Sequence, residues 1–173
     1  MLLASPAYHA RQNLTLVMDG ETLLYGLQIP RFTYVFISSN NPGVMELVHE
    51  LKQTQTDFAV THELPEHPAP PSRHSPVTHC LLYLTKRTFV GEAGEMLAGE
   101  IKRARSLHLP VILVHETDER KDGCDFDKFL LSTPSDLIRD GLFRTLAVPM
   151  AAGAEHRLVS LGLLGKSLGG HTR

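Results

Sequence analysis

The chain has 173 residues, about the length of one domain. Its formal net charge is −2, and hydrophobic and charged residues make up 42% and 21% of it. This near-neutral balance argues against a dedicated nucleic-acid binder, which would carry a basic excess. No apolar run reaches the roughly 18 residues that a membrane-spanning helix needs, so no membrane span is predicted.

Cysteine usage and the first residues of the chain indicate a compartment. Cys80 lies in an apolar run and Cys124 in a polar stretch, so the two are not clustered. Residues 1–6 lack the basic start and the long apolar run of a signal peptide. Unclustered cysteines without a signal peptide are typical of a reducing compartment, and we expect a cytoplasmic protein.

Residues 1–30 are predicted to be an N-terminal extension. Two strand-like runs, residues 14–18 and 21–25, flank Asp19-Gly20. Asp-Gly between two such runs is a strong signal for a two-residue β-turn, so the extension is predicted to hold a β-hairpin. A separate domain is predicted over residues 31–170.

That domain begins with a predicted strand, residues 32–38, and a polar exit, residues 39–43. Asn41 can cap the helix that follows, and Pro42 suits its first position. Residues 58–61 predict the second strand. Apolar residues at helical spacing define the buried face of the intervening helix: Val44, Leu47, Val48 and Leu51.

A long connection, residues 62–78, follows the second strand. Its five prolines forbid a regular helix, and its length exceeds that of common connections, which indicates a functional or mobile segment. Several of the ten histidines lie in or beside it: His62, His67, His74 and His79. Their irregular spacing does not match a zinc site, so we expect solvated loop histidines and no metal.

The remaining elements alternate in the same way. Strands are predicted at residues 80–84, 111–115 and 146–148, and the polar residues 116–128 are predicted to form a loop. Helices are predicted over residues 91–108, 133–141 and 155–168, the last with a stripe of Leu158, Leu161, Leu164 and Leu168.

The pattern predicts an α/β fold: a flavodoxin-like five-stranded parallel sheet, order 2-1-3-4-5, with helices on both faces. In such sheets the ligand crevice lies at the carboxyl ends of the strands, between the first and the third. Its predicted walls are residues 38–43 and 85–91. Phosphate-binding glycine motifs and a nucleophile elbow are absent from the sequence, which disfavours P-loop, dinucleotide-redox and α/β-hydrolase enzymes.

Glu100 is the most informative single residue. The helical period places it beside Leu97 and Ala104, at the border of the buried stripe of its helix. A partly desolvated carboxylate near the crevice can stabilise positive charge that develops on a sugar ring when a glycosidic bond breaks. A solvated flank glutamate is the competing interpretation, and Glu92 and Glu95 are competing acids that suit the helix dipole.

Four segments resemble TIR (Toll/interleukin-1 receptor) domains, over residues 32–168. Residues 34–39 resemble the family's opening "VFISY" strand, and residues 81–89 its "VLSxxY" segment. Residues 96–100 fall where the family has W-C-x-x-E, and residues 109–114 resemble its "xxPIIPV" strand.

The resemblance implies a TIR-like domain over residues 31–170. Some TIR domains cleave NAD⁺ at the nicotinamide–ribose bond, in signalling or defence, with the glutamate of W-C-x-x-E. Carried over, Glu100 is the catalytic residue and NAD⁺ is a substrate, so no cofactor is expected. A homo-oligomer through TIR–TIR contacts is also implied. The implied substrate-binding residues are Ser38, Ser39, Asn40, Asn41, Thr85, Lys86, Arg87 and Phe89.

The sequence departs from the family at several points. Met96 and Leu97 replace Trp and Cys, and the stretch between Thr85 and Glu100 is longer than usual. Residues 62–78 stand where the family has its BB loop and second helix. Two alternatives therefore stay open: a non-catalytic signalling module that acts by self-association, and a nucleoside 2-deoxyribosyltransferase-like enzyme.

Two basic residues and one histidine at strand ends complete the candidates. Lys86 and Arg87 could bind a pyrophosphate beside the crevice. The pattern is equally consistent with two solvated surface cations. His115 ends the fourth predicted strand and could reach the crevice, although a satisfied strand-end histidine is favoured.

Overall fold

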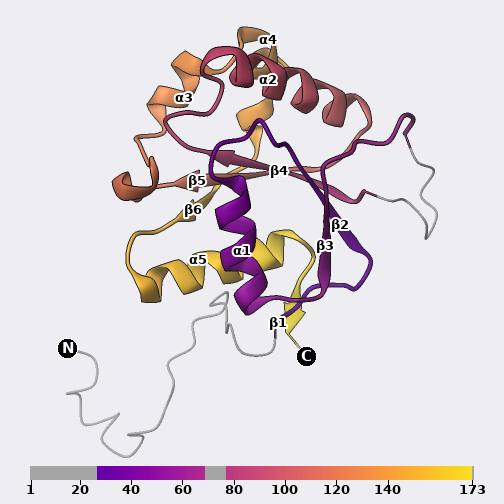
Figure 1. Cartoon of the computed structure of the whole chain (residues 1–173), viewed down its shortest axis with the longest axis vertical. Coiled ribbons are helices and arrows are strands. Elements are labelled where there is room, and N and C mark those ends of the chain that lie inside the picture. The colour runs from indigo at the N-terminus through magenta and orange to yellow at the C-terminus, as the bar shows by residue number, and fades with distance from the viewer. Residues whose placement is uncertain (1–26, 69–76, 173) are drawn as a thin grey trace, which may run out of the picture.

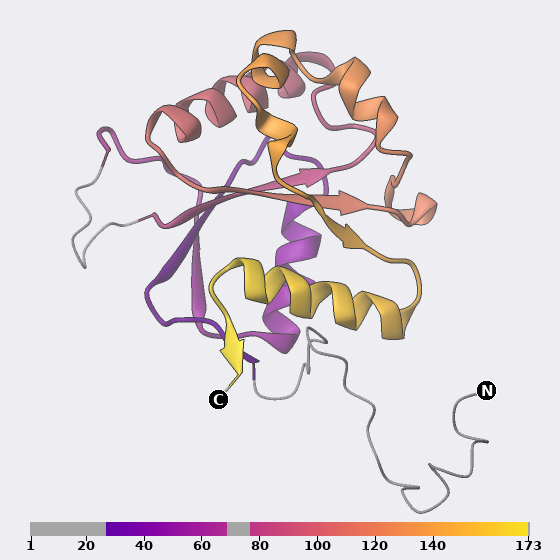
Figure 2. The ribbon, with the colours of Figure 1, turned by 180° about the vertical axis from the view of Figure 1, so that it is seen from behind.

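A computed structural model of the chain describes residues 27–68 and 77–172. The predicted hairpin at residues 14–25 lies outside the described residues. Short strands at the two ends of the described chain, β1 (Leu27–Gln28) and β7 (His171–Thr172), pair antiparallel (Figure 2).

The α/β class is confirmed, with a five-stranded, all-parallel sheet. Along the sheet the strand order is β3-β2-β4-β5-β6, so the first of these strands lies between the second and the third. The five strands are β2 (Thr33–Ile37), β3 (Phe58–Thr61), β4 (His79–Leu84), β5 (Val111–Glu116) and β6 (Val148–Met150).

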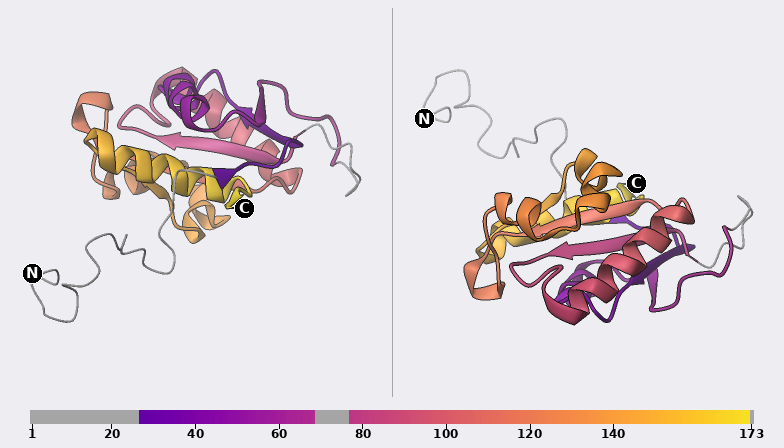
Figure 3. Two further views of the ribbon diagram at one scale, coloured as in Figure 1. Left: turned by 90° about the horizontal axis from the view of Figure 1, so that it is seen from below. Right: turned by 90° about the horizontal axis from the view of Figure 1, so that it is seen from above.

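Helices cover both faces of the sheet (Figures 1 and 3). On one face lie α1 (Val44–Thr54) and α5 (Ala154–Ser167). On the other lie α2 (Gly91–Ser106), α3 (Asp127–Ser132) and α4 (Ser135–Arg139). Two 3₁₀ turns, η3 (Glu119–Lys121) and η4 (Leu142–Arg144), complete the described elements.

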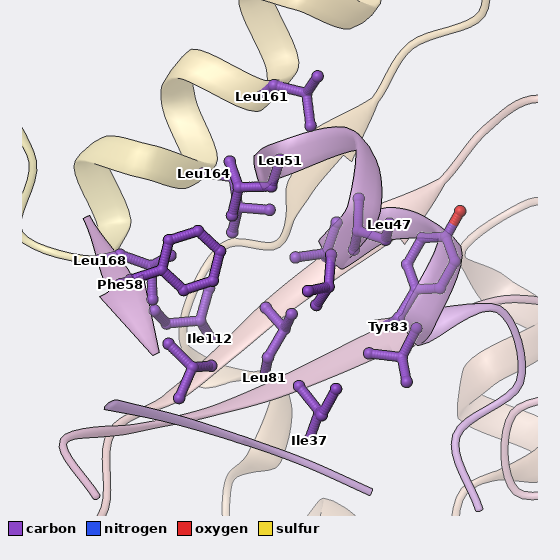
Figure 4. Packing of buried hydrophobic residues seen from close by; sticks show 14 of the residues in the cluster. Ile37, Leu47, Leu51, Phe58, Leu81, Tyr83, Ile112, Leu161, Leu164 and Leu168 are labelled. Atoms are coloured by element: carbon purple, nitrogen blue, oxygen red, sulfur yellow. The ribbon is translucent and has the colours of Figure 1, made fainter. Parts of the chain in front are cut away.

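Two core clusters result from the alternation of side chains along the strands. In β2, Val35 and Ile37 enter the first cluster, under α1 and α5, while Phe36 enters the second, under α2. Figure 4 shows the first cluster, where Leu51 of α1 lies near Leu164 of α5 and Leu47 of α1 lies near Tyr83 of β4. The sheet is therefore covered on both faces, as a parallel sheet requires.

The last strand of the sheet begins two residues later than predicted. The strand predicted at residues 146–148 is observed as β6, and Leu146 is 98% exposed. Pro149 lies inside β6, which among the described strands pairs only with β5. Such an edge strand tolerates proline because one of its sides has no ladder. The helix α3 also begins inside the segment predicted as loop, residues 116–128.

Candidate functional site

The predicted helix stripe holds Glu100 at its border. In α2 the buried residues are Gly94, Leu97, Ala98, Ile101 and Ala104, and Glu100 is half-buried beside them. The helical period in the sequence predicts Ala93 for the same stripe, together with Leu97, Ile101 and Ala104, but Ala93 is exposed. Gly94 fixes the start of α2, because a Cβ there would lie 2.2 Å from the backbone carbon of Phe89. The first turn of α2 therefore packs directly against the backbone of the turn after β4, and Glu100 lies further along the same helix.

The Glu100 carboxylate meets the carboxyl end of β2. The hydroxyl of Ser38, which directly follows β2, donates to Oε2 of Glu100 in a short hydrogen bond. The side-chain amide of Asn40 lies 3.4 Å from Oε1. These contacts join residues about sixty positions apart in sequence, so the tertiary fold brings Glu100 to the predicted crevice wall.

The hydroxyl of Ser38 both accepts and donates a hydrogen bond within the protein. It is 2% exposed, its Oγ accepts the backbone N–H of Asn40 at 2.9 Å, and its hydroxyl proton goes to Glu100. Ser39 beside it is exposed. The geometry thus gives Ser38 a role in holding the carboxylate, while within residues 27–68 and 77–172 Oε1 has one hydrogen bond, from Asn40 at 3.4 Å.

The segment after β3 lies beside α2. Nδ1 of His62 is 3.1 Å from the carbonyl oxygen of Ile37, and the guanidinium of Arg103 donates to the carbonyl oxygen of Pro65 at 3.2 Å.

Burial, together with the nearby Glu100 carboxylate, raises the pKa of the Cys80 thiol to about 12. Cys80 is therefore a buried core thiol and not a nucleophile.

Asn41 has a different role from the predicted one. Its side-chain amide donates to the carbonyl oxygen of Tyr83 at 2.7 Å and its Oδ1 accepts the Tyr83 N–H at 2.8 Å. The buried side chain thus ties the β2 exit to β4, and it does not cap α1. Gly43 precedes that helix with φ 79° and approaches the Tyr83 ring, where a Cβ would lie 3.1 Å from Cε1.

The β4 exit is a buried turn. The hydroxyl of Thr88 accepts the Thr85 N–H at 2.9 Å and donates to the carbonyl oxygen of Tyr83 at 2.9 Å. Phe89 is buried in the second core cluster, with a positive φ of 61°. Thr88 and Phe89 therefore shape the turn and do not offer free groups to a ligand.

Lys86 and Arg87 emerge from this turn and share one carboxylate. Nζ of Lys86 lies 2.8 Å, and Nη1 of Arg87 3.7 Å, from Asp122. The hydrogen bond from Lys86 is the main cause that lowers the pKa of Asp122. Lys86 lines a cavity of about 410 Å³ with His115 and Cys124, whereas Arg87 lines another.

That second cavity, which we name the β4 cavity, lies at the carboxyl ends of β2, β4 and β5. Its volume is about 310 Å³. It lies on the α1 face of the sheet, since Leu47 and Tyr83 of its lining belong to the first core cluster. Of the predicted site residues, Thr85 and Arg87 line it. The full lining is Pro42, Gly43, Glu46, Leu47, Glu50, Tyr83, Thr85, Arg87, Arg120, Lys121 and Asp122.

Five of the nine predicted site residues fall into two groups, and Ser39, Asn41, Lys86 and Phe89 belong to neither. Glu100, Ser38 and Asn40 form one cluster on the α2 face, and Glu100 does not line the β4 cavity. Thr85 and Arg87 belong to the cavity. The two predicted walls of the crevice do lie next to each other, since Gly43 and Thr85 line the same cavity. The two groups of predicted site residues, however, lie on opposite faces of the sheet.

A buried ionic network under the β4 cavity escaped the sequence analysis. Glu116 is 0% exposed and accepts the Tyr83 hydroxyl, the Asp118 N–H at 2.8 Å and the guanidinium of Arg157 at 2.9 Å. Arg157 also pairs with Glu50, which in turn binds Lys121. The network ties α1, α5 and the β4 and β5 strands together.

Two signals in the sequence could have found this network. Glu116 continues the alternation of Ile112 and Val114, which both enter the first core cluster. Arg157 stands four residues before Leu161, on the buried stripe of α5, while the predicted stripe residue Leu158 is 43% exposed. A charged residue in phase with a buried stripe needs a buried partner.

Electrostatics in this network follow from burial and pairing. Burial and the bond to Glu116 raise the pKa of Tyr83 well above its ordinary value. Although burial opposes it, hydrogen bonds from Arg157 and Lys121 hold the pKa of Glu50 below its ordinary value. The two carboxylates therefore serve as ion-pair partners for Arg157.

His115 is satisfied within the protein. Its Nε2 lies 2.7 Å from the carbonyl oxygen of Cys124, and its ring packs edge-on against Phe126 and Phe129. The structure thus favours the strand-end interpretation. His74 lies outside the described residues. Within residues 27–68 and 77–172, no group of three or more His, Cys, Asp or Glu side chains is arranged to hold a metal.

Comparison of the chain with family models, curated proteins and solved structures gives no match. Among the helices that the structure describes, none is both long and apolar enough to cross a membrane.

Proposed function

We propose that the chain cleaves NAD⁺ at the bond between nicotinamide and ribose, with Glu100 as the catalytic carboxylate. The observation that carries the proposal is the position of Glu100: half-buried on α2, at the carboxyl end of β2, with one oxygen held by Ser38. Parallel sheets bind ligands at this edge, next to the strand where the connections change direction. The resemblance of residues 32–168 to TIR domains supports the same residue.

The main requirement of this reaction is a carboxylate fixed beside the ribose ring. When the bond between ribose C1′ and the pyridinium nitrogen breaks, its electron pair returns to nitrogen and nicotinamide leaves as a neutral molecule. Positive charge then develops on the ribose ring, and a carboxylate fixed beside it stabilises that charge. Water that attacks C1′ and loses a proton completes the hydrolysis.

The surroundings of Glu100 suit this role. A charge stabilises a transition state best when it is oriented before the reaction and shielded from water. Ser38 holds Oε2, and among the residues that the structure describes Oε1 has only the Asn40 amide, at 3.4 Å. One oxygen is thus anchored, and the other has spare acceptor capacity for a ribose.

The test is nicotinamide release from NAD⁺ by concentrated protein, with Glu100→Gln beside the wild type. We expect the variant to lose at least about 100-fold in rate, the scale of one lost electrostatic contact in a site. Glu95→Gln is the matched control, because Glu95 lies on the same helix and is exposed. Equal release by wild type and Glu100→Gln would exclude Glu100 as the catalytic residue.

Two other outcomes would replace the proposal. Base exchange on free deoxynucleosides, with no nicotinamide release, would indicate a nucleoside 2-deoxyribosyltransferase-like enzyme that uses the same carboxylate. No reaction with either substrate, together with oligomers that form equally in wild type and Glu100→Gln, would indicate a signalling module that acts by self-association.

A further inference from the structure

The β4 cavity contains ligand-binding groups that the proposed chemistry at Glu100 does not use. Its volume of about 310 Å³ lies within the range of about 300–1,000 Å³ that is typical of small-molecule sites. Basic side chains from two different loops line it: Arg87 after β4, and Arg120 and Lys121 in η3. Basic groups that converge on one cavity favour a phosphate ligand.

The acids around the cavity leave Arg87 and Lys121 with donors to spare, whereas the guanidinium of Arg120 is paired with Asp118 at 2.8 Å. Asp122 is shared between Arg87, at 3.7 Å, and Lys86, at 2.8 Å, so Arg87 is the more distant partner. Glu50 is shared between Lys121 and Arg157. The side chain of Arg87 is 66% exposed, so its remaining donors are accessible to a phosphate.

Glu46 adds a second kind of group. It lies in the first turn of α1, lines the cavity, is exposed, and has no ion pair within the described part of the chain. An unpaired carboxylate accepts hydrogen bonds from the hydroxyls of a ribose, as acidic residues do in dinucleotide-binding folds. Basic groups and one free carboxylate together fit a ribose phosphate better than a bare anion.

The cavity and Glu100 are neighbours along the chain. Asn40 contacts Glu100, and Pro42 lines the cavity, so the two sites flank one short loop. Two residues span at most about 7 Å between their Cα atoms, so the loop that borders the cavity also borders the Glu100 cluster. A ligand that occupies both sites would cross the end of β2, from the α2 face to the α1 face.

We propose that the β4 cavity is a subsite for a ribose phosphate, the ADP half of the dinucleotide whose nicotinamide half lies at Glu100. The inference rests on the proposed function for its substrate. It assigns Arg87 and Lys121 to the phosphates and Glu46 to the ribose hydroxyls.

The first test is calorimetric titration of the full chain with ADP. We expect binding to the wild type, and affinity about tenfold or more weaker in Arg87→Ala, the loss expected for one charge-assisted contact. Arg139→Ala is the matched control, because Arg139 is exposed on α4, on the other face of the sheet. Thermal melts of each variant establish that it is folded. No ADP binding to the wild type, or equal affinity in Arg87→Ala, would overturn the subsite.

The second test uses two substrates. Nicotinamide riboside lacks the phosphates, so Arg87→Ala should raise KM for NAD⁺ and leave KM for nicotinamide riboside unchanged. ADP should also compete with NAD⁺; inhibition that does not compete would overturn the assignment to the substrate. The two proposals fail separately: Arg87-dependent ADP binding without nicotinamide release rejects the chemistry at Glu100, and release indifferent to Arg87 rejects the subsite.

Discussion

Two carboxylates, Glu100 and Glu116, stand at the carboxyl edge of the same sheet, on opposite faces. Glu116 is fully buried, and both of its oxygens bind Arg157 as well as a backbone N–H or the Tyr83 hydroxyl. Glu100 is half-buried, and in the described part of the chain each of its oxygens has one hydrogen bond, Oε2 from Ser38 and Oε1 from Asn40 at 3.4 Å. A saturated carboxylate stabilises the fold, whereas one with spare acceptor capacity is available to a ligand.

The largest expected effect on stability is that of replacing Glu116, the buried carboxylate. Glu116→Ala leaves the Tyr83 hydroxyl without its partner and Arg157 with one carboxylate in place of two. We expect a loss of about 3 kcal/mol in the free energy of unfolding, measured with urea. Glu119→Ala, at an exposed position nearby, should change it by less than about 0.5 kcal/mol. A similar small change in Glu116→Ala would mean that the network is not structural.

Acid should weaken the same network. The pKa of Glu50 is lower in the folded protein than its ordinary value of 4.5, so its contribution is present above that value and is lost as pH falls through the lower folded value. We expect the unfolding free energy to fall below about pH 4.5, and Glu50→Gln to flatten that slope. The loss is about 2 kcal/mol, the scale of hydrogen bonds to charged groups. A slope unchanged in Glu50→Gln would contradict this assignment.

Ser38 tests the anchoring of the other carboxylate. Ser38→Ala removes one hydrogen bond to Glu100 and should lower the unfolding free energy by about 1 kcal/mol. If the proposed activity is present, kcat should fall by up to about 100-fold with KM unchanged, because the carboxylate is no longer oriented. Ser39→Ala is the stability control, since Ser39 is exposed. An unchanged kcat in Ser38→Ala would show that Glu100 needs no such support.

The smallest expected effect is that of Glu100→Gln on stability. The glutamine side chain can still accept the Ser38 hydrogen bond, so we expect a change within about 0.5 kcal/mol in urea unfolding. This near-neutral result would sharpen the contrast with Glu116→Ala. A loss as large as that of Glu116→Ala would instead make Glu100 a second structural carboxylate.

Local patterns predicted most of the elements but not their long-range partners. Helical period placed Glu100 at the border of its stripe, and the structure confirms that position. The cap assigned to Asn41 was wrong because its true partner, Tyr83, is 42 residues away and acts through its backbone. The helix α3 was missed because Phe129 is its one buried residue, so it has no periodic stripe.

The β4 cavity was predictable in place but not in composition. The strand order directs attention to the edge between β2 and β4, where the cavity lies. Lys121 and Arg120 come from a turn after β5 that reads as an ordinary charged loop. The ion pair between Lys121 and Glu50 and the shared cavity lining show that this turn reaches α1.

The pairing of β1 with β7 has a consequence for engineering the molecule. Leu27 stands opposite Thr172, and β1 leads directly into the amino end of β2, so both strands lie at the edge of the sheet away from Glu100 (Figure 2). A short peptide could join Thr172 to Leu27, and a circularly permuted chain could open elsewhere. A fusion partner joined directly to Leu27 or Thr172 would lie at the amino edge of the sheet, away from Glu100.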